Sequence, residues 1–403
     1  MNEAVNRLVE VLKKHVELDI EEVGLLNAAG RVASENISAT RDKPSWDLSA
    51  VDGYALNSVE TIGASLYNPI EFRVVGVLRP GQRPGDVCIE SGTAVRVHTG
   101  APLPCGANAV VMDEDVEVLG NKILVYRQVA EGSNVIFRGE DLKKGEVICE
   151  KGQIVSPAVI AALTSSGIRS IRVYRKIRIS IISIGDELVE PGEVGQGECN
   201  STAYILYSQL LKDVVFEPKY YGIIPDDPII VEESVLKEIE RGVDVVITTG
   251  GTGVGESDVI ESIAKKHMLV FRGVRMRPGR PTSCSIINGK PVIHLSGFPV
   301  AAWTGYELIL RNAVIKWLGL KEFNRPIIKG VLTRRLPNVV GYVSVVRVSV
   351  ELNGDEFLVE PYMLRGSGVI SSLLRTTGYL ILPEDVEGYD KGTKVTVYLH
   401  TYW

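Results

Sequence analysis

A glycine-rich stretch from Val243 to Asp258 constrains the fold more than any other part of the chain. It begins with β-branched residues interrupted only by Asp244, a pattern typical of a buried parallel strand. Gly250, Gly251, Gly253 and Gly255 follow within a few residues, and an apolar-periodic segment comes next. The stretch therefore predicts a strand, a tight turn and a helix start. Such a turn presents backbone N–H groups and the positive end of a helix dipole to an anion.

Two interpretations of this turn are open. Turns between strands and helices of a doubly wound sheet carry glycines for geometry alone. The number of glycines, together with the hydroxyls of Thr248, Thr249 and Thr252, favours a phosphate or oxyanion site. The spacing matches neither the P-loop nor the dinucleotide fingerprint, because no lysine follows the glycines and G-x-G-x-x-G is absent.

The pattern of elements predicts a multidomain α/β plus β protein. Residues 1–44 and 141–175 are expected to form one split N-terminal domain, in which the helix at 2–14 packs against the helix at 158–165. Residues 45–140 contain short strands between glycine and proline turns, which indicates an inserted β domain.

The second half of the chain divides again. Residues 176–320 alternate strands and helices, which predicts a doubly wound α/β domain with a strand pair at 281–289 and 291–297, placed at the sheet edge or as paired strands. Residues 325–403 show no helical pattern and predict a small β-barrel or sandwich.

Composition excludes several classes of function. A net charge of −6 and a pI of about 5.6 argue against an extended nucleic-acid interface. The five cysteines are scattered and lack C-x-x-C spacing, which argues against a zinc site or a disulfide framework and for a reducing compartment. Neither an N-terminal hydrophobic leader nor an 18-residue apolar run is present, so we expect a cytoplasmic protein that does not contact a membrane.

Acidic residues follow several predicted strands of the α/β domain. They are Asp186, Glu187, Asp226, Asp227 and Asp258. Because carboxyl ends of parallel strands meet at one sheet edge, these acids are expected near the glycine turn. Carboxylates beside a phosphate site suit Mg²⁺. Structural roles are open for each: Asp227 precedes Pro228 and is a good N-cap, Asp258 can cap its own helix, and Glu187 can be merely solvated.

A basic loop accompanies the acids. Arg277 and Arg280 stand between prolines and Gly279, where guanidinium groups can bind oxyanions in bidentate fashion. An exposed charged turn is the competing interpretation. In the β domain, the loops at 49–55, 99–104 and 137–141 are ordinary turns by turn chemistry alone.

Taken in order, the motifs resemble one family across nearly the whole chain. They are SAVDGYA, HTGAPLPCGANAVV, RGED, ISIGDEL, GIIPDD, TTGGTGVGESD, RPGRP and LSGFPV. This set is similar to the molybdopterin molybdenumtransferases, which are the bacterial and archaeal MoeA proteins and the E domain of gephyrin. The resemblance implies a split lateral domain with an inserted β domain, a molybdopterin-binding α/β domain and a C-terminal β-barrel.

The resemblance also implies an activity and partners. Molybdenum from molybdate would be transferred to adenylylated molybdopterin with release of AMP, in a Mg²⁺-dependent step that completes molybdenum cofactor biosynthesis. The protein would be a homodimer with its active site between subunits, and a molybdopterin adenylyltransferase would act upstream.

Site residues follow from the matching motifs. The implied catalytic residues are Asp52, Glu187, Asp227 and Asp258. The implied Mg²⁺ ligands are Glu187, Asp226 and Asp258. The implied substrate-binding residues are Thr99, Arg138, Asp141, Gly250, Gly251, Gly253, Ser257, Arg277, Arg280 and Pro299.

The sequence departs from the family pattern at two places. Ser296 replaces the first proline of L-P-G-x-P, and Val51 replaces a common methionine before Asp52. Tungstate is chemically close to molybdate, so a tungstate-inserting enzyme is a second possibility. A gephyrin-like scaffold without this activity is a third, and a relative that adenylylates the pterin is a fourth.

Overall fold

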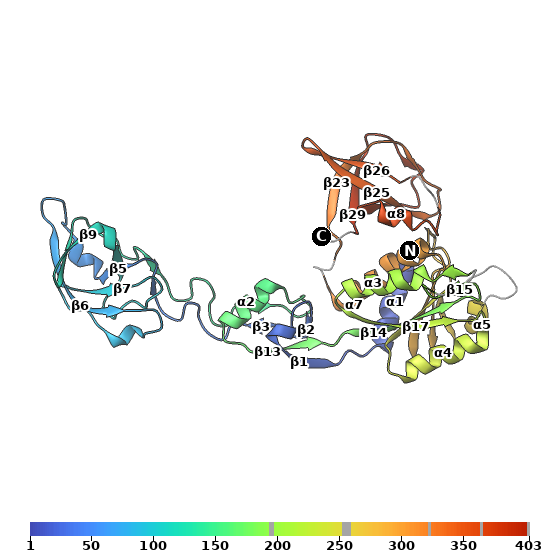
Figure 1. Cartoon of the computed structure of the whole chain (residues 1–403), viewed down its shortest axis with the longest axis horizontal. Helices are drawn as coiled ribbons and strands as arrows, with labels where there is room; N and C mark the ends of the chain where they lie inside the picture. Colours follow the sequence, from blue (N-terminus) through green and yellow to red (C-terminus); the bar gives the residue numbers. More distant parts are fainter. Residues whose placement is uncertain (193–196, 252–258, 321–323, 363–365, 401–403) are drawn as a thin grey trace.

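The chain is elongated, with a large α/β body at one end, a small middle part, and a β unit at the far end (Figure 1). The computed structural model describes residues 1–192, 197–251, 259–320, 324–362 and 366–400. The chain passes outward through the middle part and returns through it, so the far β unit is an insertion. A C-terminal barrel packs on the α/β body, and together these parts confirm the predicted multidomain α/β plus β class.

A six-stranded sheet organises the α/β body. Its order is β17 (Phe216–Ile224), β14 (Ile177–Ile184), β18 (Val245–Thr249), β22 (Lys290–Leu295), β21 (Ser283–Ile287) and β19 (Met268–Phe271). The first four strands are parallel, and the last two are antiparallel to their neighbours. Because the chain moves from β14 to one side and then back to β18 on the other, the strand order reverses between these two strands, where such folds bind ligands.

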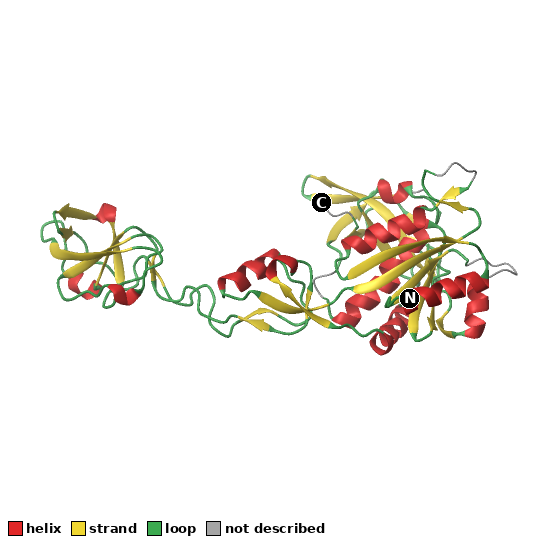
Figure 2. Ribbon diagram, turned by 60° about the horizontal axis from the view of Figure 1, so that its bottom comes forward, coloured by secondary structure: helices red, strands yellow, loops and turns green. Residues whose placement is uncertain are grey.

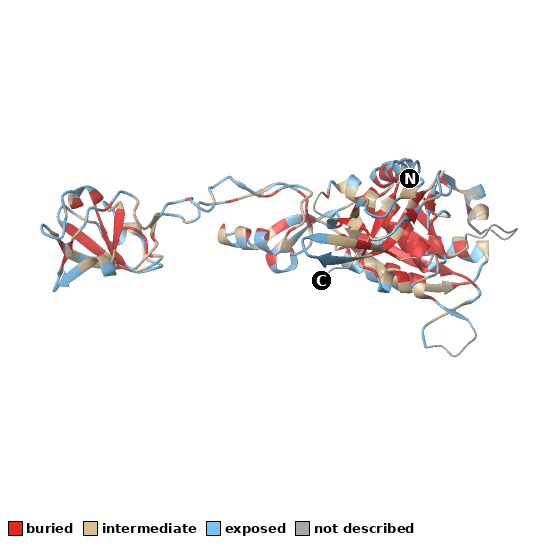
Figure 3. Cartoon of the chain, turned by 90° about the horizontal axis from the view of Figure 1, so that it is seen from above, coloured by how far each residue is buried: buried red, intermediate tan, exposed pale blue. Residues whose placement is uncertain are grey.

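Helices cover both faces of this sheet (Figure 2). One face carries α1 (Asn2–His15), α3 (Ser201–Lys212) and a long helix made of α6 (Pro299–Gly305), the π-helical turn η5 (Tyr306–Leu310) and α7 (Arg311–Leu318). The other face carries α4 (Pro228–Glu240) and α5 (Val259–Lys266). Strand β18 is buried along its whole length because both of its faces are covered, as its apolar sequence predicts. Figure 3 shows that buried residues gather inside the α/β body. Among the described helices, none has the length and apolar character needed to cross a bilayer.

The structure corrects two sequence predictions about packing. The prediction that α1 packs on α2 (Pro157–Ser165) was wrong, because α1 packs on α7 and shares the core of the α/β body. An amphipathic pattern shows that one face of a helix is buried, but not against which partner. The β21–β22 hairpin forms as expected but lies inside the sheet instead of at its edge, because β19 continues the sheet beyond β21.

The middle part and the insertion are mainly β. The middle part has the three-stranded sheet β1 (Ile20–Gly24), β13 (Ser170–Tyr174), β2 (Val32–Ala33) and the pair β12 (Val147–Cys149), β3 (Ile37–Ser38), with α2 packed on them. The pair β4 (Leu48–Ser49), β11 (Val135–Ile136) leads into the insertion. The insertion has the sheet order β8 (Ala109–Met112), β5 (Gly53–Leu56), β7 (Thr93–Val97), β6 (Ile70–Leu78), β10 (Lys122–Val125), β9 (Val116–Leu119).

The C-terminal unit is a closed five-stranded barrel. Its order is β25 (Val343–Asn353), β26 (Glu356–Pro361), β23 (Ile327–Leu332), β29 (Lys394–Leu399) and β27 (Gly378–Leu382), and β27 pairs back with β25. The short strand β20 (Met276–Arg277) of the α/β body joins β25 from outside. The basic loop of Arg277 and Arg280, from here on the arginine loop, is thereby fixed to the barrel.

The insertion contains a disulfide that the sequence did not predict. Cys88 and Cys105, separated by 17 residues, are bonded with their Cα atoms 4.6 Å apart. The backbones of the two residues form a bridge, and the N–H of Ile89 donates to the carbonyl of Cys105. The sequence argued against a disulfide framework and gave no sign of this single pair, because the fold brings together cysteines whose spacing has no motif.

Candidate active site

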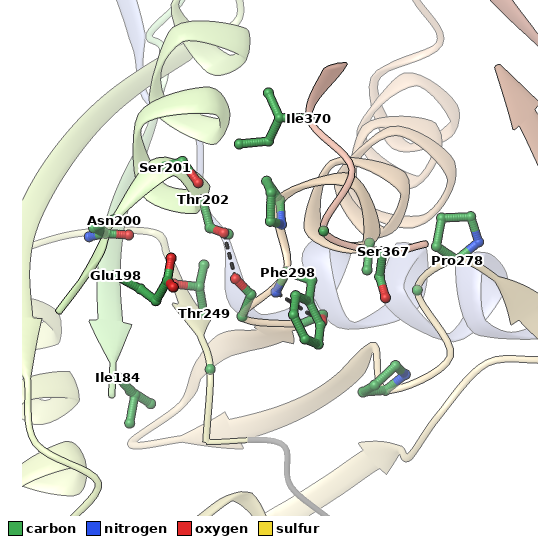
Figure 4. A pocket seen from close by; sticks show the side chains of 18 of the residues that line it. Ile184, Glu198, Asn200, Ser201, Thr202, Thr249, Pro278, Phe298, Ser367 and Ile370 are labelled. Carbon is green, nitrogen blue, oxygen red and sulfur yellow. Dashed lines mark hydrogen bonds between the residues drawn. The ribbon is translucent and has the colours of Figure 1, made fainter. Parts of the chain in front are cut away.

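A pocket of about 910 Å³ opens at the carboxyl ends of β14, β18 and β22 (Figure 4). Its walls come from the α/β body, the arginine loop and a barrel segment that includes Ser367, Gly368 and Ile370. Many of the predicted site residues line it. They are Glu187, Gly250, Gly251, Arg277, Arg280 and Pro299, and the hydroxyl-bearing Thr249 lies beside them.

Glycine is required at the described start of the turn after β18. Gly250 has a φ of +91°, and a Cβ there would lie 2.1 Å from the carbonyl oxygen of Ile184. Gly251 also has a positive φ, of +62°. The backbone can therefore pass close to β14 only without side chains. The predicted residues Gly253, Ser257 and Asp258 lie outside the described residues, so their roles stay predictions.

The two arginines of the basic loop line this pocket without carboxylate partners among the described residues. The guanidinium of Arg277 lies 4.1 Å from the ring centroid of Tyr342, a cation–π contact that orients it. Strand pairing of Arg277 with Ser344 holds its backbone on the barrel. Arg280 is exposed at the pocket wall. Two cationic groups that no described carboxylate neutralises can bind an anionic ligand.

Three of the predicted acids, Asp186, Glu187 and Asp226, lie near one another at neighbouring strand ends. Of these, only Glu187 lines the pocket. Burial raises the pKa of Asp226, and the nearby carboxylates of Glu187 and Asp186 raise it further. Glu187 folds back over Gly185, where a Cβ would lie 2.8 Å from one of its carboxylate oxygens. Within the described ranges, no group of three His, Cys, Asp or Glu side chains is arranged to hold a metal ion.

Asp227 has a structural role in the fold. Its Oδ1 accepts hydrogen bonds from the N–H groups of Ile229, at 2.8 Å, and Ile230, at 3.2 Å. It therefore caps α4, the structural role that its place before Pro228 suggests. A catalytic role for Asp227 stays a prediction.

A polar network at the base of the pocket was not predicted from the sequence. Asn200 caps α3, and its Nδ2 donates to Ser183 Oγ at 2.9 Å and to Tyr220 Oη at 2.7 Å. Tyr220 donates in turn to Glu190. Burial is the main cause that raises the pKa of Tyr220, and the carboxylate of Glu190 raises it further. Thr249 donates to Ser183 at 3.2 Å, so the network reaches the start of the glycine turn.

The loop with the unusual Ser296 is ordered by that serine. Its Oγ accepts a hydrogen bond of 3.2 Å from the N–H of Phe298, and Thr202 Oγ1 donates to the carbonyl of Gly297 at 2.5 Å (Figure 4). The serine hydroxyl thus fixes the turn into α6, where the family pattern has a proline.

A second pocket, of about 350 Å³, adjoins the first through Arg277, Pro278 and Ser367. Arg347 of β25 lines it and is only 6% exposed. Its guanidinium donates to Ser372 Oγ and to the carbonyl of Val345, both at 3.1 Å, and no described carboxylate pairs with it. Burial lowers its pKa. Sequence reasoning missed Arg347, although the alternation Val343, Val345, Arg347 places it on the buried face of its strand.

The insertion carries a separate polar site. The N–H of Thr99 donates to Asp52 Oδ1 at 2.7 Å, its hydroxyl lies 3.3 Å from the same oxygen, and His98 Nδ1 lies 3.5 Å away. The Thr99 N–H is the main cause that lowers the pKa of Asp52. This site lies in the part of the chain farthest from the α/β body, so one chain does not bring Asp52 to the pocket (Figure 1).

Arg138 and Asp141 lie between the insertion and the middle part. Arg138 Nε donates to Asp42 at 2.7 Å, and Asp141 lies 3.2 Å from Lys43 Nζ. These contacts join the outgoing and returning segments. Substrate binding by either residue stays a prediction.

Comparison with known proteins identifies the family. Three family models match in order: "MoeA N-terminal region (domain I and II)" at residues 1–167, "Probable molybdopterin binding domain" at 180–316 and "MoeA C-terminal region (domain IV)" at 329–400. A Methanocaldococcus jannaschii protein assigned to molybdopterin biosynthesis is 38% identical, covering 94% of this chain and 92% of its own. The molybdopterin molybdenumtransferase of Staphylococcus epidermidis is 31% identical, covering 99% and 95%.

The fold agrees with the sequence matches. The crystal structure of a molybdopterin biosynthesis MoeA protein from Pyrococcus horikoshii superposes with a TM-score of 0.85 at 35% identity, covering 99% of both chains. Fold and site together define a multidomain enzyme of molybdenum cofactor biosynthesis built around a molybdopterin-binding α/β domain. The chain belongs to the MoeA family of molybdopterin molybdenumtransferases.

Proposed function

We propose that this enzyme transfers molybdenum from molybdate to the dithiolene of adenylylated molybdopterin and releases AMP. The observation that carries the proposal is the pocket between β14 and β18, where the strand order reverses. In this pocket a glycine turn lies with two arginines that no described carboxylate pairs with. Backbone N–H groups at the turn and the guanidinium groups of Arg277 and Arg280 would bind the phosphates and the oxyanion. Arg347, in the adjoining pocket, is a further oxyanion ligand of this proposal.

The acids at the strand ends suit Mg²⁺. Oxygen donors from Glu187 and Asp226 fit a hard cation. Burial is the first cause that raises the pKa of Asp226, and the negative charge of the neighbouring carboxylates is the second. Glu187, Asp226 and Asp258 would hold Mg²⁺, which when bound neutralises phosphate charge. Within this arrangement, Glu187 would also orient water toward the phosphoanhydride.

The polar site of Asp52 and Thr99 would need a second chain in order to reach a pocket. We propose a homodimer in which Asp52 and Thr99 of one protomer reach the pocket of its partner. The support is the elongated shape, which separates these two residues from the pocket within one chain (Figure 1). A molybdopterin adenylyltransferase would supply the adenylylated substrate.

The test is an AMP-release assay with the full chain, adenylylated molybdopterin and Mg²⁺. Molybdate is expected to stimulate AMP release, and a rate independent of molybdate would refute the proposal. A parallel reaction with tungstate distinguishes the two oxyanions. The Glu187→Gln variant is expected to lose about 100-fold or more in rate. Glu233→Gln, at an exposed position of α4, is the control.

A further inference from the structure

Phe298 is an exposed aromatic residue inside the pocket. Its side chain is at the N-cap position of α6 and is 60% exposed. Among the described residues that line the pocket, it is the only aromatic one. Because this exposed ring lines a pocket, its apolar face is available to a bound ligand.

The backbone around Phe298 is held at each neighbouring position. Its N–H donates to Ser296 Oγ at 3.2 Å, and its carbonyl accepts from the N–H of Ala302 at 2.9 Å. The N–H of Val300 donates to the carbonyl of Ser367 at 2.9 Å, which ties this turn to the barrel. The ring is therefore exposed on a rigid support rather than on a loose loop, and a rigid support reduces the entropy cost of binding.

One side of the ring is covered and the rest is open. A Cβ at Gly368 would lie 3.2 Å from Cδ1 of Phe298, so the barrel backbone packs against the ring edge at a residue without a side chain. In the view of Figure 4, the ring lies between Thr249 of the sheet and Ser367 of the barrel. The arginines and the glycine turn occupy other parts of the same pocket.

We propose that the Phe298 ring is the stacking platform for the flat nitrogen heterocycle of the substrate. The pocket then has a cationic end at Arg277 and Arg280 and an aromatic end at Phe298, which matches a ligand with phosphate groups and a planar ring. Stacking of a heterocyclic base on an aromatic side chain contributes about 1–3 kcal/mol and needs no particular base. The proposal rests on the proposed function for the identity of the ring, which is either adenine or pterin.

Direct binding to the full chain tests this. AMP, ribose 5-phosphate and neopterin are titrated separately by calorimetry into wild type, Phe298→Leu and Phe298→Tyr. Leucine keeps an apolar side chain but has no aromatic face. We expect Phe298→Leu to weaken binding of AMP or of neopterin by about 5- to 150-fold, the equivalent of the stacking energy, and to leave ribose 5-phosphate within about twofold. Phe298→Tyr should bind as wild type.

The probe that loses affinity identifies the stacked ring. Affinities that are unchanged between wild type and Phe298→Leu for all three probes would overturn the proposal, as would a wild-type chain that binds neither AMP nor neopterin. A change in dimer dissociation without any change in probe affinity would assign Phe298 to a protein contact and would also overturn it. Tyr67→Leu, at a 99% exposed aromatic position of the insertion, is the control. The titrations need no turnover, so failure of the proposed reaction leaves their result readable.

Discussion

Arg325 binds Glu307 through two contacts of 2.7 Å, Nε to Oε1 and one terminal nitrogen to Oε2. Both side chains are almost fully buried, at 2% and 1% exposure. Glu307 belongs to the long helix of the α/β body, and Tyr379 of the barrel donates to it at 2.9 Å. Arg325 also lies 3.2 Å from Asp213. The pair therefore fixes the barrel, and with it the barrel wall of the pocket, to the α/β body.

Removal of this arginine should destabilise the junction strongly. Arg325→Met removes the two-point partner of the buried Glu307 carboxylate and one of the two arginine partners of Asp213, which costs about 3–5 kcal/mol. Urea unfolding monitored by tryptophan fluorescence measures the loss. The exposed pair of Arg335 with Asp390, 3.6 Å apart, offers the control Arg335→Met, for which no measurable change is expected. A loss below about 1 kcal/mol for Arg325→Met would contradict this account of the junction.

His294 makes the α/β body sensitive to acid. It is fully buried in β22, with Thr248 Oγ1 2.8 Å from Nδ1 and Ser285 Oγ 2.8 Å from Nε2. Burial lowers its pKa to about 4 from an ordinary value of 6.5. Below pH 6.5 His294 binds a proton in the unfolded chain but stays neutral in the folded chain. The free energy of unfolding therefore falls between pH 6.5 and 4 by up to about 1.4 kcal/mol per pH unit.

The His294→Gln variant isolates this contribution. Its stability deficit relative to wild type should be smaller at pH 5 than at pH 7.5 by about 2 kcal/mol, because only wild type loses the histidine contribution. Unfolding free energies at the two pH values give the difference. His400 is also buried with a pKa lowered to about 4, but it is present in both chains and cancels. An equal deficit of His294→Gln at both pH values would contradict the assignment.

Local signals in the sequence predicted much of this fold. Asp227 caps the helix that the sequence assigned to it, because a cap depends on residues within one turn, and Ser156 and Asn200 cap α2 and α3 in the same way. The buried β18 and the glycine turn after it also follow from a short stretch. The position of α1 does not, because its apolar face fits any complementary surface.

Residues whose place at the candidate site depends on distant contacts could not be found from the sequence. The strand alternation places Arg347 on a buried face, but only the folded barrel shows that no described carboxylate pairs with it. The Asn200 network needs Tyr220 and Glu190 from separate segments. The exposure of Phe298 likewise depends on Gly368, far along the chain. Spacing alone carries no information about such tertiary contacts.

Asp227 can be assigned to capping or to catalysis by two substitutions. Asp227→Ala should lose about 1 kcal/mol of stability, while Asp227→Asn keeps a side-chain oxygen for the N–H groups of Ile229 and Ile230 and should be nearly as stable as wild type. If the residue only caps α4, Asp227→Asn also keeps its rate of AMP release. A large rate loss in a stable Asp227→Asn chain would show that the carboxylate takes part in the reaction. Asp226→Asn, at the adjacent acid, is the comparison.

The proposed division of the site between two chains predicts complementation. Asp52→Asn and Glu187→Gln chains should each be inactive alone, because every site lacks one group. A mixed dimer unites the intact Asp52 of one chain with the intact Glu187 of the other at one of its two sites. Mixing Asp52→Asn with Thr99→Val should restore nothing, because both defects lie in the insertion.

The most direct measurement is therefore molybdate-dependent AMP release after equimolar subunit exchange between the Asp52→Asn and Glu187→Gln chains. We predict recovery to about one quarter of the wild-type rate, since about half of the dimers are mixed and each carries one intact site. Exchange is verified with a tagged chain. No recovery after verified exchange, or full activity of either variant alone, would contradict the account.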